Sequence, residues 1–125
     1  MRRLLFSIVI LLCGFQAAAL ADPLTAPSFW KNQRGSELMI TAVSSSGAIR
    51  GTFTNRAAGF GCQGIPYPVT GRTTAQQTTF KVNFVRCRTV TTWTGVVNGL
   101  TMPTTWILIY NGPTQTGFDF FTRFR

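Results

Sequence analysis

The amino-acid sequence predicts an all-β protein, an eight-stranded antiparallel up-and-down β-barrel. From Ser28 onward, apolar and polar residues alternate with the two-residue period of half-buried strands, and Thr, Val, Ile and Phe dominate. Turn-forming residues interrupt this alternation at intervals of roughly 10 to 15 residues. Consecutive antiparallel strands with mostly tight turns favour a barrel, because closure removes the exposed sheet edges. A β-sandwich is the alternative, since the number of strands does not separate the two folds.

The N-terminal segment is organised like a secretory signal peptide. Met1–Arg3 is basic, Leu4–Leu12 is apolar, and Ala19–Ala21 is a small-x-small cleavage site. An uncleaved membrane anchor is the alternative, but the apolar run falls short of the roughly 20 residues of a spanning helix. We therefore expect cleavage of residues 1–21, a secreted or periplasmic protein without membrane attachment, and one barrel domain at residues 22–125.

The alternation predicts eight strands, each bounded by residues that favour turns. The strands are Ser28–Lys31, Glu37–Ser44, Ala48–Asn55, Tyr67–Arg72, Gln77–Val85, Thr89–Val97, Met102–Tyr110 and Gly117–Phe124. The turns lie at Asn32–Gly35, Ser45–Gly47, Gly71–Gln76, Asn98–Gly99 and Asn111–Pro113. The only long connection, Arg56–Pro66, is rich in glycine and contains Cys62.

The alternation also predicts which residues face the barrel interior. In the fifth strand, Phe80, Val82 and Phe84 share one face, while Lys81 and Asn83 lie on the other. The same rule applied along the chain gives the following inward set: Phe53, Asn55, Phe80, Val82, Phe84, Thr89, Thr91, Trp93, Thr104, Trp106, Leu108, Asp119 and Phe121. A register slip of one residue would turn all of them outward.

Several interior positions are polar, which a packed core does not require. They are Asn32, Ser36, Asn55, Thr89, Thr91 and Asp119. Burying these groups together is costly unless they find hydrogen-bond partners, so a ligand with complementary polar edges is expected among them. For Asp119 the alternative is an exposed surface acid, and for the aromatic residues the alternative is plain core filling. Trp93 beside Thr89 and Thr91 favours a small ligand that is partly apolar.

The two cysteines that remain after leader cleavage, Cys62 and Cys87, favour one disulfide in an exported protein, with two free thiols as the alternative.

Without Arg2 and Arg3 the formal charge falls from +9 to +7. Such a charge attracts acidic partners in general. A basic barrel that binds nucleic acid, or a carrier of another small hydrophobic ligand, is therefore an alternative function.

Catalysis is not expected from this composition. The chain has no histidine, and with only three acidic residues it offers no evident buried carboxylate pair. No cluster has the spacing of a metal site, so no metal and no cofactor are predicted.

Seven segments resemble the avidins in order and spacing. They are Trp30–Ser36, Gly51–Phe53, Thr70–Arg72, Phe80–Phe84, Thr91–Gly95, Thr105–Leu108 and Phe118–Thr122. The segment Asn55–Gln63, followed by Pro66–Pro68, is especially similar to the dimeric, rhizavidin-like branch of that family. In that branch the loop cysteine that matches Cys62 is bonded to the one that matches Cys87.

The resemblance implies a biotin site at the open end of the barrel. By this analogy Asn32 and Ser36 would donate to the ureido oxygen, and Asn55 and Asp119 would accept from the two ureido N–H groups. Thr91 would approach the thioether sulfur, while Thr89 and backbone N–H groups of Ala57–Gly61 would hold the carboxylate. The walls would be Phe84, Trp93, Trp106 and Leu108.

The sequence departs from the avidin pattern at three places. Phe53 replaces a tyrosine, which removes one of the three donors to the ureido oxygen and costs on the order of 1 kcal/mol. Phe84 replaces a wall tryptophan with a smaller ring. Asn111–Thr116 lacks the tryptophan that caps a neighbouring subunit's site in tetrameric avidins, so the resemblance implies a homodimer with self-contained sites.

Overall fold

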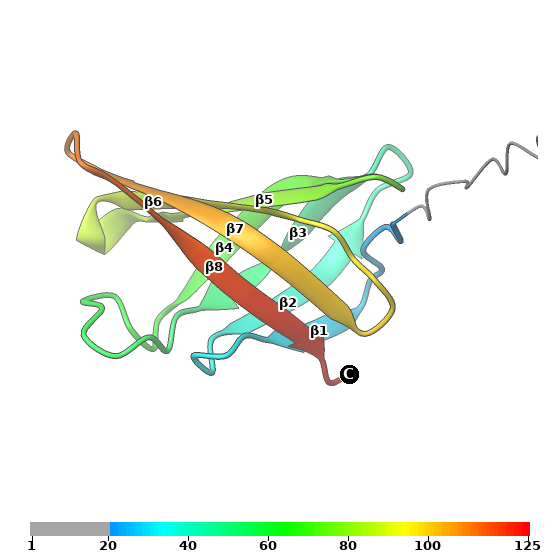
Figure 1. Cartoon of the computed structure of the whole chain (residues 1–125), viewed down its shortest axis with the longest axis horizontal. Helices are drawn as coiled ribbons and strands as arrows, with labels where there is room; N and C mark the ends of the chain where they lie inside the picture. Colours follow the sequence, from blue (N-terminus) through cyan, green and yellow to red (C-terminus); the bar gives the residue numbers. More distant parts are fainter. Residues whose placement is uncertain (1–20) are drawn as a thin grey trace, which may run out of the picture.

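The computed structural model describes residues 21–125 as a closed antiparallel barrel of eight strands. Each strand pairs with the next along the chain, and β1 pairs with β8 to close the sheet (Figure 1). This confirms the predicted up-and-down barrel and excludes the sandwich. The predicted signal peptide, residues 1–21, lies outside the described residues except for Ala21.

The observed strands agree closely with the predicted ones. They are β1 Ser28–Lys31, β2 Glu37–Val43, β3 Ala48–Thr54, β4 Pro66–Thr73, β5 Thr78–Phe84, β6 Thr89–Gly95, β7 Thr101–Tyr110 and β8 Thr114–Arg123. The largest difference is the start of β8, at Thr114 instead of Gly117. The strand begins earlier because Thr114 pairs with Ile109 directly after the β7–β8 turn.

The predicted phase of the alternation is also correct. Phe80, Val82 and Phe84 are at most 1% exposed, whereas Lys81 and Asn83 are exposed. Aromatic rings fill the interior. The ring of Phe80 stacks on that of Trp93 with centroids 5.1 Å apart, and the ring centroid of Phe53 lies 4.7 Å from that of Trp93. The barrel is therefore a packed core over part of its length rather than a pore.

The two ends of the barrel differ. One end, here called the open end, carries the connections β1–β2, β3–β4, β5–β6 and β7–β8 (Figure 1). The other end, here called the closed end, carries the remaining hairpins and the segment before β1. There Leu24 is 2% exposed and belongs to the hydrophobic core, and its backbone N–H donates to Thr73 Oγ1 at 2.7 Å.

One disulfide ties together two connections of the open end. Cys62 lies in the long β3–β4 loop, residues 55–65, and Cys87 ends the short 3-10 helix η1, Val85–Cys87. The two cysteines are bonded with a Cα–Cα distance of 6.0 Å, which confirms the predicted pairing. Within residues 21–125, no helix has the length and apolar character needed to cross a membrane.

Candidate ligand-binding site

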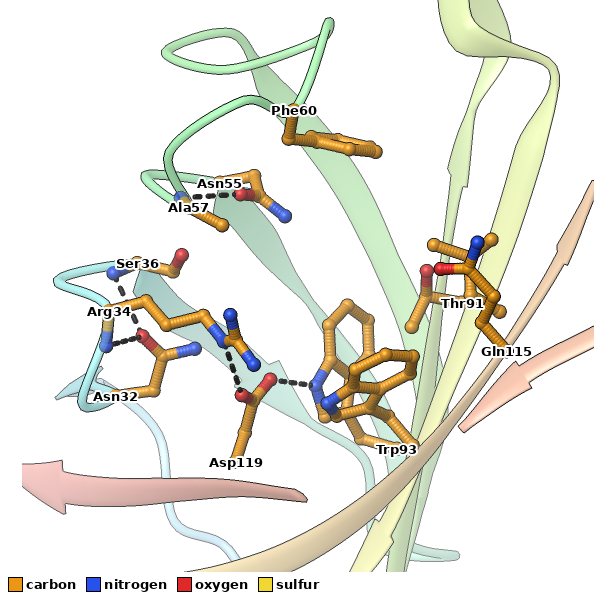
Figure 2. A pocket seen from close by; sticks show the side chains of 12 residues that line it. Asn32, Arg34, Ser36, Asn55, Ala57, Phe60, Thr91, Trp93, Gln115 and Asp119 are labelled. Atoms are coloured by element: carbon orange, nitrogen blue, oxygen red, sulfur yellow. Dashed lines mark hydrogen bonds and ion pairs between the residues drawn. The ribbon is translucent and has the colours of Figure 1, made fainter. Parts of the chain in front are cut away.

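A cavity of about 150 Å³ opens at the open end of the barrel (Figure 2). Its walls combine polar side chains with aromatic ones. The residues that line it are Asn32, Arg34, Ser36, Asn55, Ala57, Phe60, Thr91, Trp93, Trp106, Leu108, Gln115 and Asp119. Eight of these had been predicted as site residues: Asn32, Ser36, Asn55, Thr91, Trp93, Trp106, Leu108 and Asp119.

The β1–β2 turn presents two hydrogen-bond donors to the cavity. Asn32 Oδ1 accepts from the backbone N–H groups of Arg34 at 3.0 Å and Ser36 at 2.9 Å, so the amide NH₂ of Asn32 is left to donate. Ser36 Oγ accepts from the backbone N–H of Arg56 at 2.8 Å, which leaves its hydroxyl proton free. The turn thus uses the acceptors of both side chains and keeps their donors for a ligand.

Asp119 forms the centre of the polar network. Its Oδ2 accepts from Trp93 Nε1 at 2.8 Å, and its Oδ1 accepts from Gln33 Nε2 at 3.0 Å. Thr104, opposite Asp119 in the β7–β8 register, donates to the Asp119 backbone oxygen at 2.7 Å. The residue is only 5% exposed, so its predicted burial is correct and the surface alternative is wrong.

Arg34 reaches from the β1–β2 turn into the same network, as Figure 2 shows. Its Nε lies 3.3 Å from Asp119 Oδ1, and its side chain is 48% exposed. The guanidinium therefore lies between the mouth of the cavity and the buried carboxylate. Arg34 lies in a predicted turn, but the sequence pattern does not assign it to the site.

Beside Ser36 in Figure 2, Asn55 follows β3 and introduces the β3–β4 loop. Its Oδ1 accepts from the backbone N–H of Ala57 at 2.8 Å and retains a second lone pair. Phe60, from the same loop, packs edge-on against Phe84 with ring centroids 5.1 Å apart. The loop thereby closes one side of the cavity with an aromatic ring.

Two indoles form the deeper wall. Trp93 and Trp106 are cross-strand neighbours in the β6–β7 register, so both side chains lie on the same face of the sheet. Gly117 lies opposite Trp106 on β8, where any Cβ would collide with the indole. This glycine lets Trp106 lie flat over β8. The site therefore joins a flat apolar wall to a cluster of hydrogen-bonding groups, the composition of a pocket for a small and partly polar ligand.

A model described as Avidin family matches residues 21–124. The chain belongs to the avidin family. It is 36% identical over 107 residues to afifavidin of Afifella pfennigii, across 76% of this chain and 67% of afifavidin. Among solved structures, the bradavidin2–biotin complex is 48% identical with a TM-score of 0.78, covering 82% of this chain and all of bradavidin2. The rhizavidin–biotin complex is 39% identical with a TM-score of 0.73, and the match covers 79% of this chain and 100% of the rhizavidin chain. The predicted resemblance is confirmed.

Three predicted site residues of this avidin do not line the cavity. Phe53 and Phe84 are at most 1% exposed and lie behind the wall, where their rings pack edge-on at 6.1 Å. Thr89 begins β6 just after η1 and is 7% exposed, and its buried Oγ1 has no hydrogen-bond partner among residues 21–125. Their inward direction was predicted correctly, but the alternation does not show which side chains cover them: Trp93 packs on Phe53 and Phe60 packs on Phe84.

Sequence reasoning missed Arg34, Phe60 and Gln115 as lining residues. Gln115 was missed because β8 starts earlier than predicted. Phe60 lies in a loop, where no periodicity gives side-chain direction, although the Ala57–Gly61 loop had been expected near the ligand.

Within residues 21–125, no group of three or more His, Cys, Asp or Glu side chains is arranged to hold a metal ion. The geometry thus offers fixed donors, acceptors and an apolar wall, which suits binding.

Proposed function

We propose that this chain binds biotin non-covalently in the open end of its barrel. The observation that carries the proposal is the pairing of free donors on Asn32 and Ser36 with a buried carboxylate on Asp119, beside two indoles, in an avidin-family barrel. A cyclic urea fused to an apolar ring system matches such a site. A basic barrel that binds nucleic acid is not favoured by these features.

Individual roles follow from which atoms the protein leaves unused. Asn32 and Ser36 would donate to the ureido oxygen, because their acceptor atoms are already occupied. Asn55 and Asp119 would accept from the two ureido N–H groups through their remaining lone pairs. Thr91 would lie near the thioether sulfur, while Trp93, Trp106 and Leu108 would pack against the ring and chain.

Thr89 is the proposed anchor for the ligand's carboxylate, which requires that its Oγ1, buried and outside the cavity lining here, becomes accessible when the ligand enters. Its buried Oγ1 has no partner in the described part of the chain, and such a group is stabilised when a ligand supplies the missing hydrogen bond. Backbone N–H groups of Ala57–Gly61 would complete this subsite. Phe53 and Phe84 would support the aromatic wall from behind rather than touch the ligand directly.

The proposal is tested by melting the purified protein with and without biotin. A ligand that binds only the native state stabilises it by mass action, by about 4 kcal/mol at a concentration 1,000 times the dissociation constant. We expect a large rise of Tm with biotin, together with a change in tryptophan fluorescence from Trp93 and Trp106. An unchanged Tm at a large biotin excess would reject the function.

We further propose a homodimer, formed through the outward face of β7 and β8. This face is unusually apolar: Phe118 is 75% exposed, and Ile107, Ile109 and Phe120 are each about half exposed. A second copy would cover these side chains, since contiguous exposed apolar surface commonly marks an interface. Phe118→Lys should yield a monomer by light scattering, and an unchanged mass would reject this interface.

Two further proposals concern the whole protein. The N-terminal pattern supports export to the periplasm or the medium after loss of residues 1–21, and mass spectrometry of the exported protein would give the cleavage site.

We also propose that the protein does not catalyse a reaction. The cavity places one carboxylate, Asp119, among fixed hydrogen bonds and offers no histidine as a general base.

A further inference from the structure

We propose that Arg34 is an internal competitor for the binding site. Its guanidinium donates to Asp119 and lines the same cavity, so it competes with the N–H donor of a urea-bearing ligand for this carboxylate. This inference rests on the proposed function, and it assigns to Arg34 control of affinity and of the salt dependence of binding.

The contacts of Asp119 carry the first step. An ionised carboxylate has about four lone-pair sites, two on each oxygen. Gln33 and Arg34 both donate to Oδ1 of Asp119 and Trp93 donates to Oδ2, so Oδ1 accepts a ligand N–H only in place of one of its two donors. A guanidinium resembles a urea, because both are planar groups in which N–H donors flank one carbon. Arg34 thus offers Asp119 the kind of donor that a cyclic urea would offer.

The Arg34 contact is also the expendable member of this network. At 3.3 Å it is the longest of the three bonds to the carboxylate. Gln33 holds β8 independently, because its amide donates to the Phe118 backbone oxygen at 3.0 Å and accepts from the Phe120 N–H at 2.8 Å. Asp119 therefore stays in position when Arg34 moves away.

The size of the cavity gives the second step. Its volume of about 150 Å³ is below the roughly 300 Å³ at which ligand pockets usually begin. Arg34 fills part of this space from the mouth, as Figure 2 shows. Because its side chain is 48% exposed, it has a direct route to solvent when a ligand enters. Displacement of Arg34 would enlarge the site without movement of a strand.

Charge distinguishes the competitor from the ligand. The Arg34–Asp119 contact is an ion pair with one half-exposed partner, so added salt weakens it by screening. A neutral ligand that donates an N–H to the same carboxylate carries no charge to be screened. Binding of an uncharged urea ligand should therefore become tighter as salt is added, and this dependence should require Arg34.

The test uses biotinamide, which keeps the urea but lacks the carboxylate, and compares Arg34→Met with Arg50→Met. Arg50 is exposed on the outward face of β3 and does not line the cavity, so the control removes the same charge elsewhere. We expect Arg34→Met to bind biotinamide about two- to five-fold more tightly than the wild type, the range of a partly exposed ion pair. Arg50→Met should match the wild type.

The salt series gives a second readout that does not depend on how well a variant folds. Between about 0.05 M and 0.5 M NaCl, the affinity of the wild type and Arg50→Met should rise more than that of Arg34→Met. Equal or weaker binding by Arg34→Met, or the same salt slope in all three proteins, would overturn the inference while leaving biotin binding intact. No biotinamide binding by any of the three proteins would instead reject the proposed function and this inference with it.

Discussion

The two ends of the barrel use the same kinds of residues for opposite purposes. At the closed end, buried polar groups are paired with one another: Thr73 with Thr78 at 2.8 Å, and Trp30 Nε1 with Ser28 Oγ at 3.0 Å. At the open end, as far as the described residues 21–125 show, Asn32 and Ser36 keep unused donors and Thr89 Oγ1 has no partner. The closed end is thus a finished core, whereas the open end is completed by a ligand.

This difference shows where stability and binding reside. A buried polar group that is satisfied within the protein contributes to the fold, while an unsatisfied one costs free energy until something binds it. Substitutions at the closed end should therefore change unfolding without changing affinity. Substitutions at the open end should change affinity.

The largest effect is expected from Leu24→Ala at the closed end. The side chain is 2% exposed, and its removal leaves a cavity against the core. We expect the free energy of unfolding to fall by about 2 to 5 kcal/mol, measured by chemical denaturation. The biotin dissociation rate of the folded variant should remain that of the wild type. A dissociation rate that rises in step with the lost stability would break the separation of the two ends.

The disulfide is expected to affect both properties, because it belongs to the open end. Changing Cys62 and Cys87 together to serine frees the β3–β4 loop from η1. The unfolding free energy should fall by about 2 to 4 kcal/mol. Biotin should also dissociate faster, since the loop that carries Phe60 is no longer held in place. If dissociation stays unchanged, the loop contributes to stability alone.

Asp119→Ala should weaken biotin binding most among single changes at the site. Loss of a hydrogen bond to a charged group costs about 1.5 to 3 kcal/mol, or about 10- to 150-fold in the dissociation constant. Thr73→Val is the matched control: it removes a buried polar group at the closed end and should lower Tm without weakening binding. Equal affinity of Asp119→Ala and the wild type would refute the role of the carboxylate.

Thr89→Val gives the smallest and most specific effect. Replacing an unpartnered buried hydroxyl by a methyl group should stabilise the free protein by about 1 kcal/mol, seen as a higher Tm without ligand. The same change should weaken biotin binding but not biotinamide binding, because only biotin carries the carboxylate that Thr89 is proposed to hold. Equal losses for both ligands would place Thr89 elsewhere in the site.

The barrel could be predicted from sequence because its signal is local. Alternation over a few residues reveals both the strands and their inward faces, and Phe80, Val82 and Asp119 are buried as predicted. The alternation, however, does not reveal which other side chains cover an inward residue. Phe53 and Phe84 were expected at the cavity surface, but Trp93 packs on Phe53 and Phe60 packs on Phe84.

The missed residues depend on contacts between distant parts of the chain. Arg34 enters the site because the Asx turn at Asn32 aims it toward Asp119, which lies 85 residues further along the chain. Phe60 faces the cavity because the loop is tied down by the disulfide and packs on Phe84. No periodic pattern reports such directions, so turns and loops at the open end were the least predictable part of the site.

The most direct test of the account is a calorimetric titration of biotin into the purified wild-type protein. The account predicts saturable binding with one biotin per barrel, because each open end contains one cavity with its own donors and acceptors. Folding of the same sample is checked by circular dichroism. Absence of saturable heat from a folded sample at several temperatures would contradict the claim that the open end is completed by biotin.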